Sequence, residues 1–269
     1  MDNRNNYKNS RRPIKREGDA VREVAEGIVY GRNQVRELLK SERAVDKIYL
    51  RKGDREGSVL QIIAMASEKG IPIVDVEREK LDQLCGGGNH QGVAAMAAEK
   101  EYCEIADILK IAEERGEKPF IVILDGVEDP YNLGAVVRCA ECAGAHGVII
   151  PKRRAAGLTP AAAKSSAGAL EHMAVAKVVN IAAAIDELQA AGVWVYAAEA
   201  DGDDLYGVDM DRAAAFVFGS EGRGVSRLVC EKSDYKISIP MYGKVNSMNV
   251  STAAAVVLTE AARQKHSVK

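Results

Sequence analysis

The sequence predicts an α/β protein in two parts: a small N-terminal α/β domain, and a larger domain in which helices cover both faces of a mainly parallel sheet. In the C-terminal half, short apolar runs such as residues 120–124 alternate with segments of helical spacing. A continuous apolar run is typical of a parallel strand buried on both faces, and strands that alternate with helices form parallel sheets. A shorter alternation of predicted helices and strands over residues 26–99 precedes it. The 269 residues are therefore enough for two domains, each with its own hydrophobic core.

The N-terminal domain, residues 26–99, is expected to mix helices and strands. Its first helix is predicted at 32–40, because Val35, Leu38 and Leu39 recur at helical spacing. The other expected elements are a strand at 47–50, a helix at 57–69, a strand at 71–76, a helix at 77–84 and a strand at 93–98. A linker helix is then predicted within residues 100–118, closing at Gly116.

The C-terminal domain, residues 119–269, alternates regularly. Its expected strands are 120–124, 147–150, 174–178, 193–198, 214–218 and 236–239. Its expected helices are 133–145, 160–167, 181–190, 225–230 and 249–264. Such an alternation predicts a sheet whose strands end at a common edge, where ligands of open α/β sheets bind.

Composition narrows the class of protein. No apolar run approaches 18 residues, so we expect no membrane span or secretory signal and a cytoplasmic protein. The five cysteines and four histidines show no metal-ligand spacing, so we expect no metal. The net charge is −2, but the first sixteen residues carry six Lys or Arg against Asp2 alone. Residues 1–25 are therefore predicted to be a disordered basic arm that follows a phosphate backbone, or alternatively a solubilising tail.

Three polar segments follow predicted strands. The first is NLGAVVR, residues 132–138, in which Asn132 either caps a helix or points into a cleft, and Arg138 is either a site residue or a solvated side chain. The second is GSEGRG, residues 219–224, whose glycines allow a ligand to approach the backbone. The third is IPMYGKVNSMNVS, residues 239–251.

With these three segments in this order, residues 120–264 resemble the SpoU/TrmH family of RNA 2′-O-ribose methyltransferases, within the knotted SPOUT class. The resemblance implies a deep trefoil knot in the C-terminal domain, where ordinary connection rules alone predict an unknotted fold. It also implies a homodimer. YGRNQVRELL and NHQGVAA are similar to the accessory domain of the 23S rRNA branch, which makes residues 26–99 an RNA substrate-binding domain and a 23S rRNA guanosine the expected target.

The resemblance implies S-adenosyl-L-methionine as the methyl donor. The matching cofactor-binding positions are Gly219, Ile239 and Met248, which the family uses through main-chain contacts, together with Ser247. The family usually has leucine where this chain has Met248, a residue of similar volume. A nicotinamide cofactor is disfavoured, because the glycine spacing of residues 219–224 reverses that of a dinucleotide fingerprint.

The resemblance places four catalytic residues: Arg138, Asn132, Glu221 and Asn249. A ribose 2′-hydroxyl is a poor acid, so Arg138 is expected to stabilise a developing alkoxide and bind phosphate, with proton acceptance left open. Asn132 is expected to orient Arg138 or the ribose. Glu221 is expected to pair with Arg138, to hold Asn132, or to be a plain surface carboxylate. Asn249 and Ser251 either satisfy the N–H groups at the start of the last helix or reach the ribose. The resemblance favours Asn249 and Ser247 as site residues and Ser251 as the helix cap.

RNA contacts are expected from basic residues in both domains. They are Arg32, Arg36, Lys152, Arg153 and Arg154, of which the last three alternatively form a solvated loop. Two other functions stay open: a tRNA guanosine 2′-O-methyltransferase, and a non-catalytic RNA-binding factor of ribosome assembly. The four catalytic candidates together argue against the second.

Overall fold

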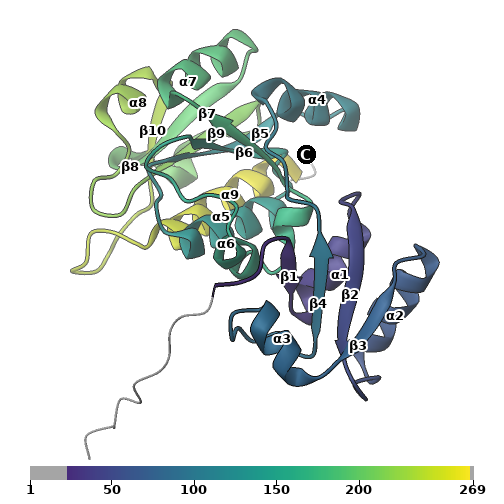
Figure 1. Cartoon of the computed structure of the whole chain (residues 1–269). Helices are drawn as coiled ribbons and strands as arrows, with labels where there is room; N and C mark the ends of the chain where they lie inside the picture. Colours follow the sequence, from purple (N-terminus) through teal and green to yellow (C-terminus); the bar gives the residue numbers. More distant parts are fainter. Residues whose placement is uncertain (1–22, 267–269) are drawn as a thin grey trace, which may run out of the picture.

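The computed structural model describes residues 23–266, which form two α/β units. The basic arm predicted at residues 1–25 lies almost wholly outside these residues. The smaller unit contains β1 (Ile28–Tyr30), α1 (Arg32–Lys40), β2 (Val45–Arg51), α2 (Ser58–Glu68), β3 (Ile73–Val76), α3 (Arg78–Leu84) and β4 (Val93–Ala97) (Figure 1). Its sheet has the order β1-β4-β2-β3, and β4 runs antiparallel to both of its neighbours.

The larger unit is built on a six-stranded sheet of order β10-β8-β9-β5-β6-β7, in which every pair of neighbours is parallel. The strands are β5 (Phe120–Asp125), β6 (Gly147–Pro151), β7 (Ala174–Val178), β8 (Trp194–Asp204), β9 (Ala214–Gly219) and β10 (Tyr235–Ser238). The helices are α4 (Ile105–Arg115), α5 (Pro130–Cys142), α6 (Pro160–Ser165), α7 (Ile181–Ala190), α8 (Arg227–Lys232) and α9 (Val250–His266), with short 3₁₀ turns η1 (Ala169–Glu171) and η2 (Leu205–Gly207).

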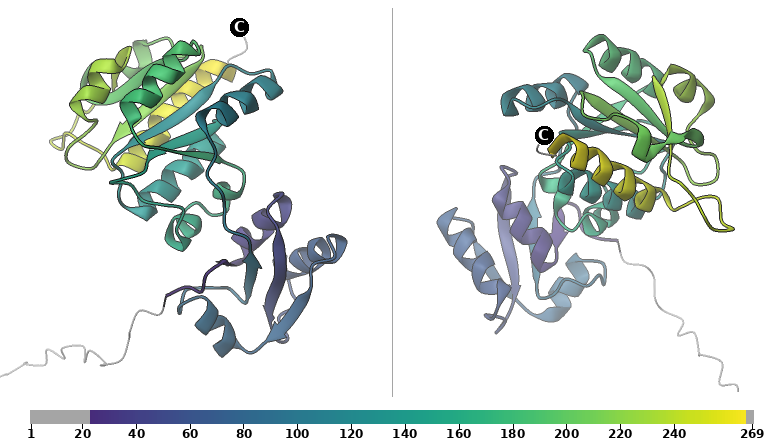
Figure 2. Two further views of the ribbon diagram at one scale, coloured as in Figure 1. Left: turned by 45° about the horizontal axis from the view of Figure 1, so that its top comes forward. Right: turned by 180° about the vertical axis from the view of Figure 1, so that it is seen from behind.

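Helices cover both faces of this sheet, which confirms the predicted fold class. On one face α5, α6 and α9 pack against Phe120, Val122 and Phe216. On the other face α4, α7 and α8 pack against Ile121 and Ile123. Figure 2 shows α9 running across its face of the sheet. The inward residues of each strand alternate between the two cores, as a strand buried on both faces requires. The trefoil knot stays a prediction.

Several boundaries differ from the sequence-based expectation. The predicted helix 133–145 begins at Pro130 and ends at Cys142. The predicted strand 193–198 continues to Asp204, because its distal part pairs with β10 beyond a register shift. The linker helix α4 is shorter than residues 100–118 and ends at Gly116, whose φ is 65°. The short strand β1 was not predicted; it is a buried edge strand beside β4.

Polar contacts join the two units through α1. His172 Nε2 lies 2.9 Å from Glu37 Oε2, and the amide of Gln34 donates to the carbonyl of Lys164 at 3.3 Å. Arg43 forms a 2.9 Å ion pair with Glu171. These contacts hold the smaller unit against the segment that contains α6 and η1.

Candidate active site

The three segments singled out in the sequence meet at the carboxyl-terminal edge of the six-stranded sheet. The start of α5 follows β5, residues 219–224 follow β9, and the chain after β10 leads into α9. Parallel strands bring these loops to one edge, although the first and the last are separated by more than a hundred residues.

A hydrogen-bond network joins the three segments. Glu221 Oε1 accepts hydrogen bonds from Asn132 Nδ2 at 3.0 Å and from Asn249 Nδ2 at 2.6 Å. Asn249 Nδ2 also donates to Asn132 Oδ1 at 3.0 Å. Asn132 is 8% exposed, so its amide is desolvated within this network. Of the contacts considered for Glu221, the structure shows the hydrogen bond with Asn132.

Of the two roles considered for Asn132, the helix cap is not found, and the cap predicted at Ser251 was wrong. Asn132 does not cap α5, because Asp129 accepts the Tyr131 N–H at 2.9 Å and Pro130 is the first helical residue. Asn132 thereby lies in the first turn with its amide available to Glu221. Ser251 does not cap α9; instead Asn249 Oδ1 accepts the Ser251 N–H at 2.9 Å and its hydroxyl at 2.6 Å. Asn249 therefore caps α9 with its oxygen and uses its nitrogen in the network.

Residues 219–224, the glycine loop, fold back on their own start. Ser220 and Gly224 exchange two backbone hydrogen bonds of 3.2 and 3.0 Å. A Cβ on Gly219 would lie 1.9 Å from the carbonyl carbon of Gly224, so no side chain fits there. Gly222 has a φ of 81°, a conformation that L-residues rarely adopt. At its three glycines the loop therefore has backbone and no side chain.

A cavity of about 1010 Å³ lies beside the network and the glycine loop. All four positions expected to bind the cofactor, Gly219, Ile239, Ser247 and Met248, line it. Glu221 and Asn249 line it as well, and apolar walls come from β9, β10 and α9. A concave site with apolar walls and a few convergent polar groups is typical of a small-molecule pocket. Its main-chain groups suit a nucleoside, whose edges carry donors and acceptors.

Arg138 lies apart from the network. It follows Asn132 by six residues, or one and two-thirds helical turns, so it projects from a different side of α5. Its side chain is exposed, and within residues 23–266 it makes no hydrogen bond or ion pair with Glu221 or Asn132. The expected pairing of Arg138 with Glu221 is therefore not found. Its catalytic role stays a prediction.

The expected RNA contacts fall into two groups. Arg32 is held by Asp54 at 3.1 Å, and Arg36 lies 3.3 Å from Glu37 Oε1, so both guanidinium groups have acidic partners. Lys152, Arg153 and Arg154 are exposed at the carboxyl end of β6. The Arg154 backbone lies close to the site, because a Cβ on Gly126 would be 4.0 Å from its carbonyl oxygen and 3.6 Å from Ser220 Cβ. The loop of residues 152–154 thus flanks the glycine loop.

Sequence reasoning missed Asp125 and Glu199, whose carboxylates bind the chain where it leaves the glycine loop. Each follows an apolar stretch of its strand, and a polar residue at that place was the available signal. In the part of the chain described, residues 23–266, no group of three His, Cys, Asp or Glu side chains is arranged to hold a metal ion. None of the helices described there is long and apolar enough to cross a bilayer.

Comparison with protein families matches both units. Residues 119–259 match the SpoU rRNA Methylase family, and residues 28–103 match the family described as RNA 2′-O ribose methyltransferase substrate binding. The chain belongs to the SpoU/TrmH family of RNA methyltransferases. The family resemblance of the three sequence segments is thereby confirmed.

Relatives of known sequence cover nearly the whole chain. YacO of Bacillus subtilis (strain 168), whose name assigns it to the TrmH family of tRNA/rRNA methyltransferases, is 46% identical over 241 residues, which are 89% of this chain and 96% of YacO. A TrmH family relative from Staphylococcus haemolyticus (strain JCSC1435) is 42% identical over 242 residues, covering 90% of this chain and 97% of that protein.

Solved structures share the fold of both units. The SpoU methyltransferase AviRb from Streptomyces viridochromogenes, solved in complex with the cofactor AdoMet, superimposes with a TM-score of 0.75 at 22% identity, covering 90% of this chain and 91% of AviRb. The AdoMet-bound rRNA methyltransferase from Sinorhizobium meliloti gives a TM-score of 0.71 at 23% identity, with 88% and 86% coverage. At these identities the likeness concerns the fold.

Proposed function

We propose that this RNA methyltransferase transfers a methyl group from S-adenosyl-L-methionine to the ribose 2′-hydroxyl of a guanosine in 23S rRNA. One observation carries the proposal: the Asn132, Glu221 and Asn249 network opens onto the cavity lined by the four expected cofactor positions. An orienting polar network beside a nucleoside-sized cavity is what a positioning mechanism needs.

The cavity residues fit the proposed cofactor. Gly219 presents bare backbone, and Ile239 and Met248 supply apolar walls. Glu221 gives the cavity a negative side chain beside the network, which suits a cofactor that carries a sulfonium cation. The bound cofactor would supply an electrophilic methyl group. The chain's own residues hold it and align the ribose.

The network is assigned to orientation. Glu221 fixes both amides, so that Asn132 and Asn249 present defined donor and acceptor groups to the ribose. None of the three side chains can neutralise an alkoxide by charge. We assign that task to the guanidinium of Arg138, which keeps its proton at ordinary pH and also suits an RNA phosphate.

The choice of rRNA is supported by the larger unit, because residues 119–259 match the family described as SpoU rRNA Methylase. The match of residues 28–103 to RNA 2′-O ribose methyltransferase substrate binding supports methylation of an RNA ribose. A tRNA guanosine is the second candidate, because the names of the curated relatives include both tRNA and rRNA. Residues 152–154 and α1 provide the proposed RNA contacts. We further propose that the enzyme acts as a homodimer in the cytoplasm.

Mapping ribose methylation in total RNA from cells with and without the gene tests the function. We expect one 23S rRNA guanosine to lose its methyl group in the deletion strain and to regain it with the wild-type gene. Complementation with Glu221→Ala should fail. Loss of methylation in a tRNA alone would transfer the proposal to the tRNA alternative, and an unchanged RNA profile would leave the non-catalytic role.

A further inference from the structure

The glycine loop is held from both sides at its exit. It follows β9, which lies between β8 and β5 in the sheet. At the exit, Glu199 Oε1 in β8 accepts the Val225 N–H at 2.5 Å, and Asp125 Oδ2 at the end of β5 accepts the Ser226 N–H at 2.7 Å. The two strands that flank β9 thus each supply one carboxylate to consecutive backbone amides. We call Glu199 and Asp125 the exit clamp.

The fit of Glu199 against the loop is close. A Cβ on Gly224 would lie 2.6 Å from Glu199 Oε1 and 3.0 Å from Oε2. Gly224 also has a φ of 67°, so glycine is required there for its conformation as well as for space. The carboxylate therefore packs directly on the loop backbone and fixes the path of the chain between Gly224 and Val225.

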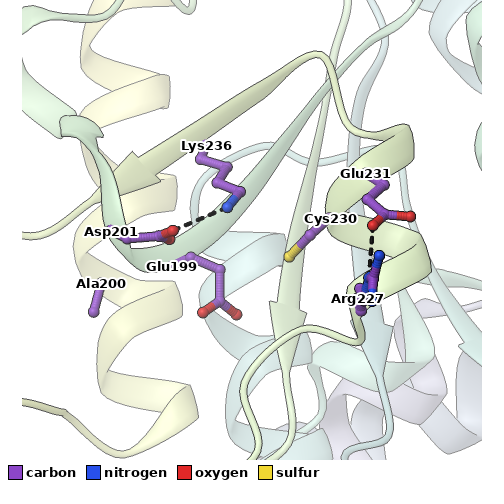
Figure 3. A pocket seen from close by; sticks show the side chains of 7 residues that line it. All are labelled: Glu199, Ala200, Asp201, Arg227, Cys230, Glu231 and Lys236. Atoms are coloured by element: carbon purple, nitrogen blue, oxygen red, sulfur yellow. Dashed lines mark hydrogen bonds and ion pairs between the residues drawn. The ribbon is translucent and has the colours of Figure 1, made fainter.

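Glu199 lines the large cavity and also a second cavity, of about 430 Å³, between β8, β10 and α8 (Figure 3). The two cations that line it have other partners: Arg227 binds Glu231 at 2.7 Å, and Lys236 binds Asp201 at 3.0 Å. Burial and the nearby Glu199 carboxylate raise the pKa of the Cys230 thiol. Among the described residues, the hydrogen bond that holds Glu199 comes from backbone.

This clamp is connected to the catalytic network through the loop itself. Glu221 lies inside the Ser220–Gly224 bridge that closes the loop, and the exit clamp fixes the far side of that bridge. Gly219, at the entry, is held by its strand pairing with Asp125 in β5 and packs on the backbone of Gly224 and Val225. Glu221 lies beyond the last paired residue of β9, so releasing the exit should displace Glu221 more than Gly219.

We infer that Glu199, supported by Asp125, is a positioning residue for methyl transfer: it holds the exit of the glycine loop so that Glu221 stays aligned with Asn132 and Asn249. The role in methyl transfer rests on the proposed function. The restraint of Val225 by Glu199 does not.

Glu199→Ala, Glu199→Gln and Asp201→Asn test the inference in the full chain. Asp201→Asn is the matched control, because Asp201 lines the same second cavity but binds Lys236 and no loop amide. Three readouts are measured: hydrogen exchange of the Val225 amide, kcat and KM on the RNA substrate, and affinity for S-adenosylhomocysteine by calorimetry. Thermal melting checks that each variant folds.

We expect Glu199→Ala to expose the Val225 amide to exchange and to lower kcat by about tenfold or more, since the variant no longer has a side-chain acceptor for that amide. Affinity for S-adenosylhomocysteine should fall by a smaller factor than kcat, because Glu199 lines the large cavity but its hydrogen bond goes to the loop amide of Val225. Glu199→Gln keeps an acceptor oxygen and should restore most of kcat and of the protection. Asp201→Asn should match the wild type.

Wild-type kcat in Glu199→Ala, or a decrease in Asp201→Asn as large as in Glu199→Ala, would overturn the inference. Glu199→Gln as inactive as the alanine variant would also overturn it, because the charge and not the restraint would then matter. If Glu199→Ala does not fold, Glu199→Gln and Glu199→Asp carry the test, since aspartate is too short to reach Val225. Hydrogen exchange needs no substrate, so it separates the two proposals. If the wild-type chain is inactive on RNA but protection of its Val225 amide depends on Glu199, the proposed function is refuted and the restraint of the loop by Glu199 still holds.

Discussion

Replacing Glu221 by alanine removes the two hydrogen bonds by which its carboxylate holds the amides of Asn132 and Asn249. A hydrogen bond to a charged group contributes about 1.5–3 kcal/mol when it is buried. Glu221 is exposed, so the lower end applies, and two bonds amount to about 3 kcal/mol. At about 1.36 kcal/mol per factor of ten, we expect kcat/KM to fall by roughly a hundredfold.

The pattern across a double-mutant cycle is more specific than the size of this decrease. Asn132→Ala removes one of the two bonds to Glu221 as well as its bond to Asn249. If the residues act as one unit, Asn132→Ala/Glu221→Ala should be no more than about threefold worse than Glu221→Ala alone. Glu221→Gln keeps an acceptor without the charge and should reduce kcat/KM roughly tenfold.

The assay is transfer of a radiolabelled methyl group to the RNA substrate, with S-adenosylhomocysteine affinity measured by calorimetry as the control for an intact cavity. Fully multiplicative decreases in the double variant would refute the network as a unit. An unchanged kcat/KM in Glu221→Ala would refute its assignment to the site altogether.

Four further predictions follow from separate features. Arg138→Ala should lower kcat by about a hundredfold or more but leave S-adenosylhomocysteine affinity nearly intact, because Arg138 lies away from the cavity; turnover within about threefold of wild type would contradict its role. Gly219→Ala should abolish S-adenosylhomocysteine binding in calorimetry, because its Cβ would meet Gly224 at 1.9 Å. Removing residues 1–25 should make RNA affinity less dependent on salt: the slope of log affinity against log salt concentration should decrease in size by about 0.7–0.9 for each phosphate that these residues bind. An unchanged slope would identify residues 1–25 as a solubilising tail. His146 is buried, its Nδ1 accepts the Phe120 N–H at 3.0 Å, and burial lowers its pKa. As pH falls, this imidazole is therefore protonated at a higher pH in the unfolded chain than in the folded chain. The melting temperature should decrease as pH drops below about 6.5, and it should decrease less in His146→Gln.

The sequence predicted those elements whose signals are local. The helices 32–40 and 181–190 and the strand 174–178 have the predicted bounds, because their apolar spacing and flanking polar residues define them within a few residues. The strand β8 was predicted too short, because Asp203 and Asp204 are poor strand formers that are held by pairing with Ile237 and Ser238. That pairing is set by residues more than thirty positions away.

The cap of α5 shows a second kind of limit. Asp129 and Asn132 are both good capping residues three positions apart, and only Pro130 at the first helical position distinguishes them. The choice matters for function, because a capping Asn132 would use its Oδ1 at the helix start, whereas in this structure that oxygen accepts the hydrogen bond from Asn249 Nδ2. The order of the three segments indicated the family. The hydrogen-bond partners of their polar atoms could not be predicted, because they are far apart in the sequence: Asn132 and Glu221 are separated by 89 positions.

The charge of the network limits how the proposed reaction can work. Glu221 makes the three-residue network negative, and the two amides add none of the positive charge that an alkoxide needs. Arg138 is a cation assigned to this task, yet it projects from another side of α5 than Asn132. The proposed function therefore assigns orientation and charge stabilisation to separate parts of the isolated chain. Under the proposed function they meet only when RNA, or RNA together with a second subunit, is bound, so catalysis depends on assembly of the complex and not on the preformed network alone.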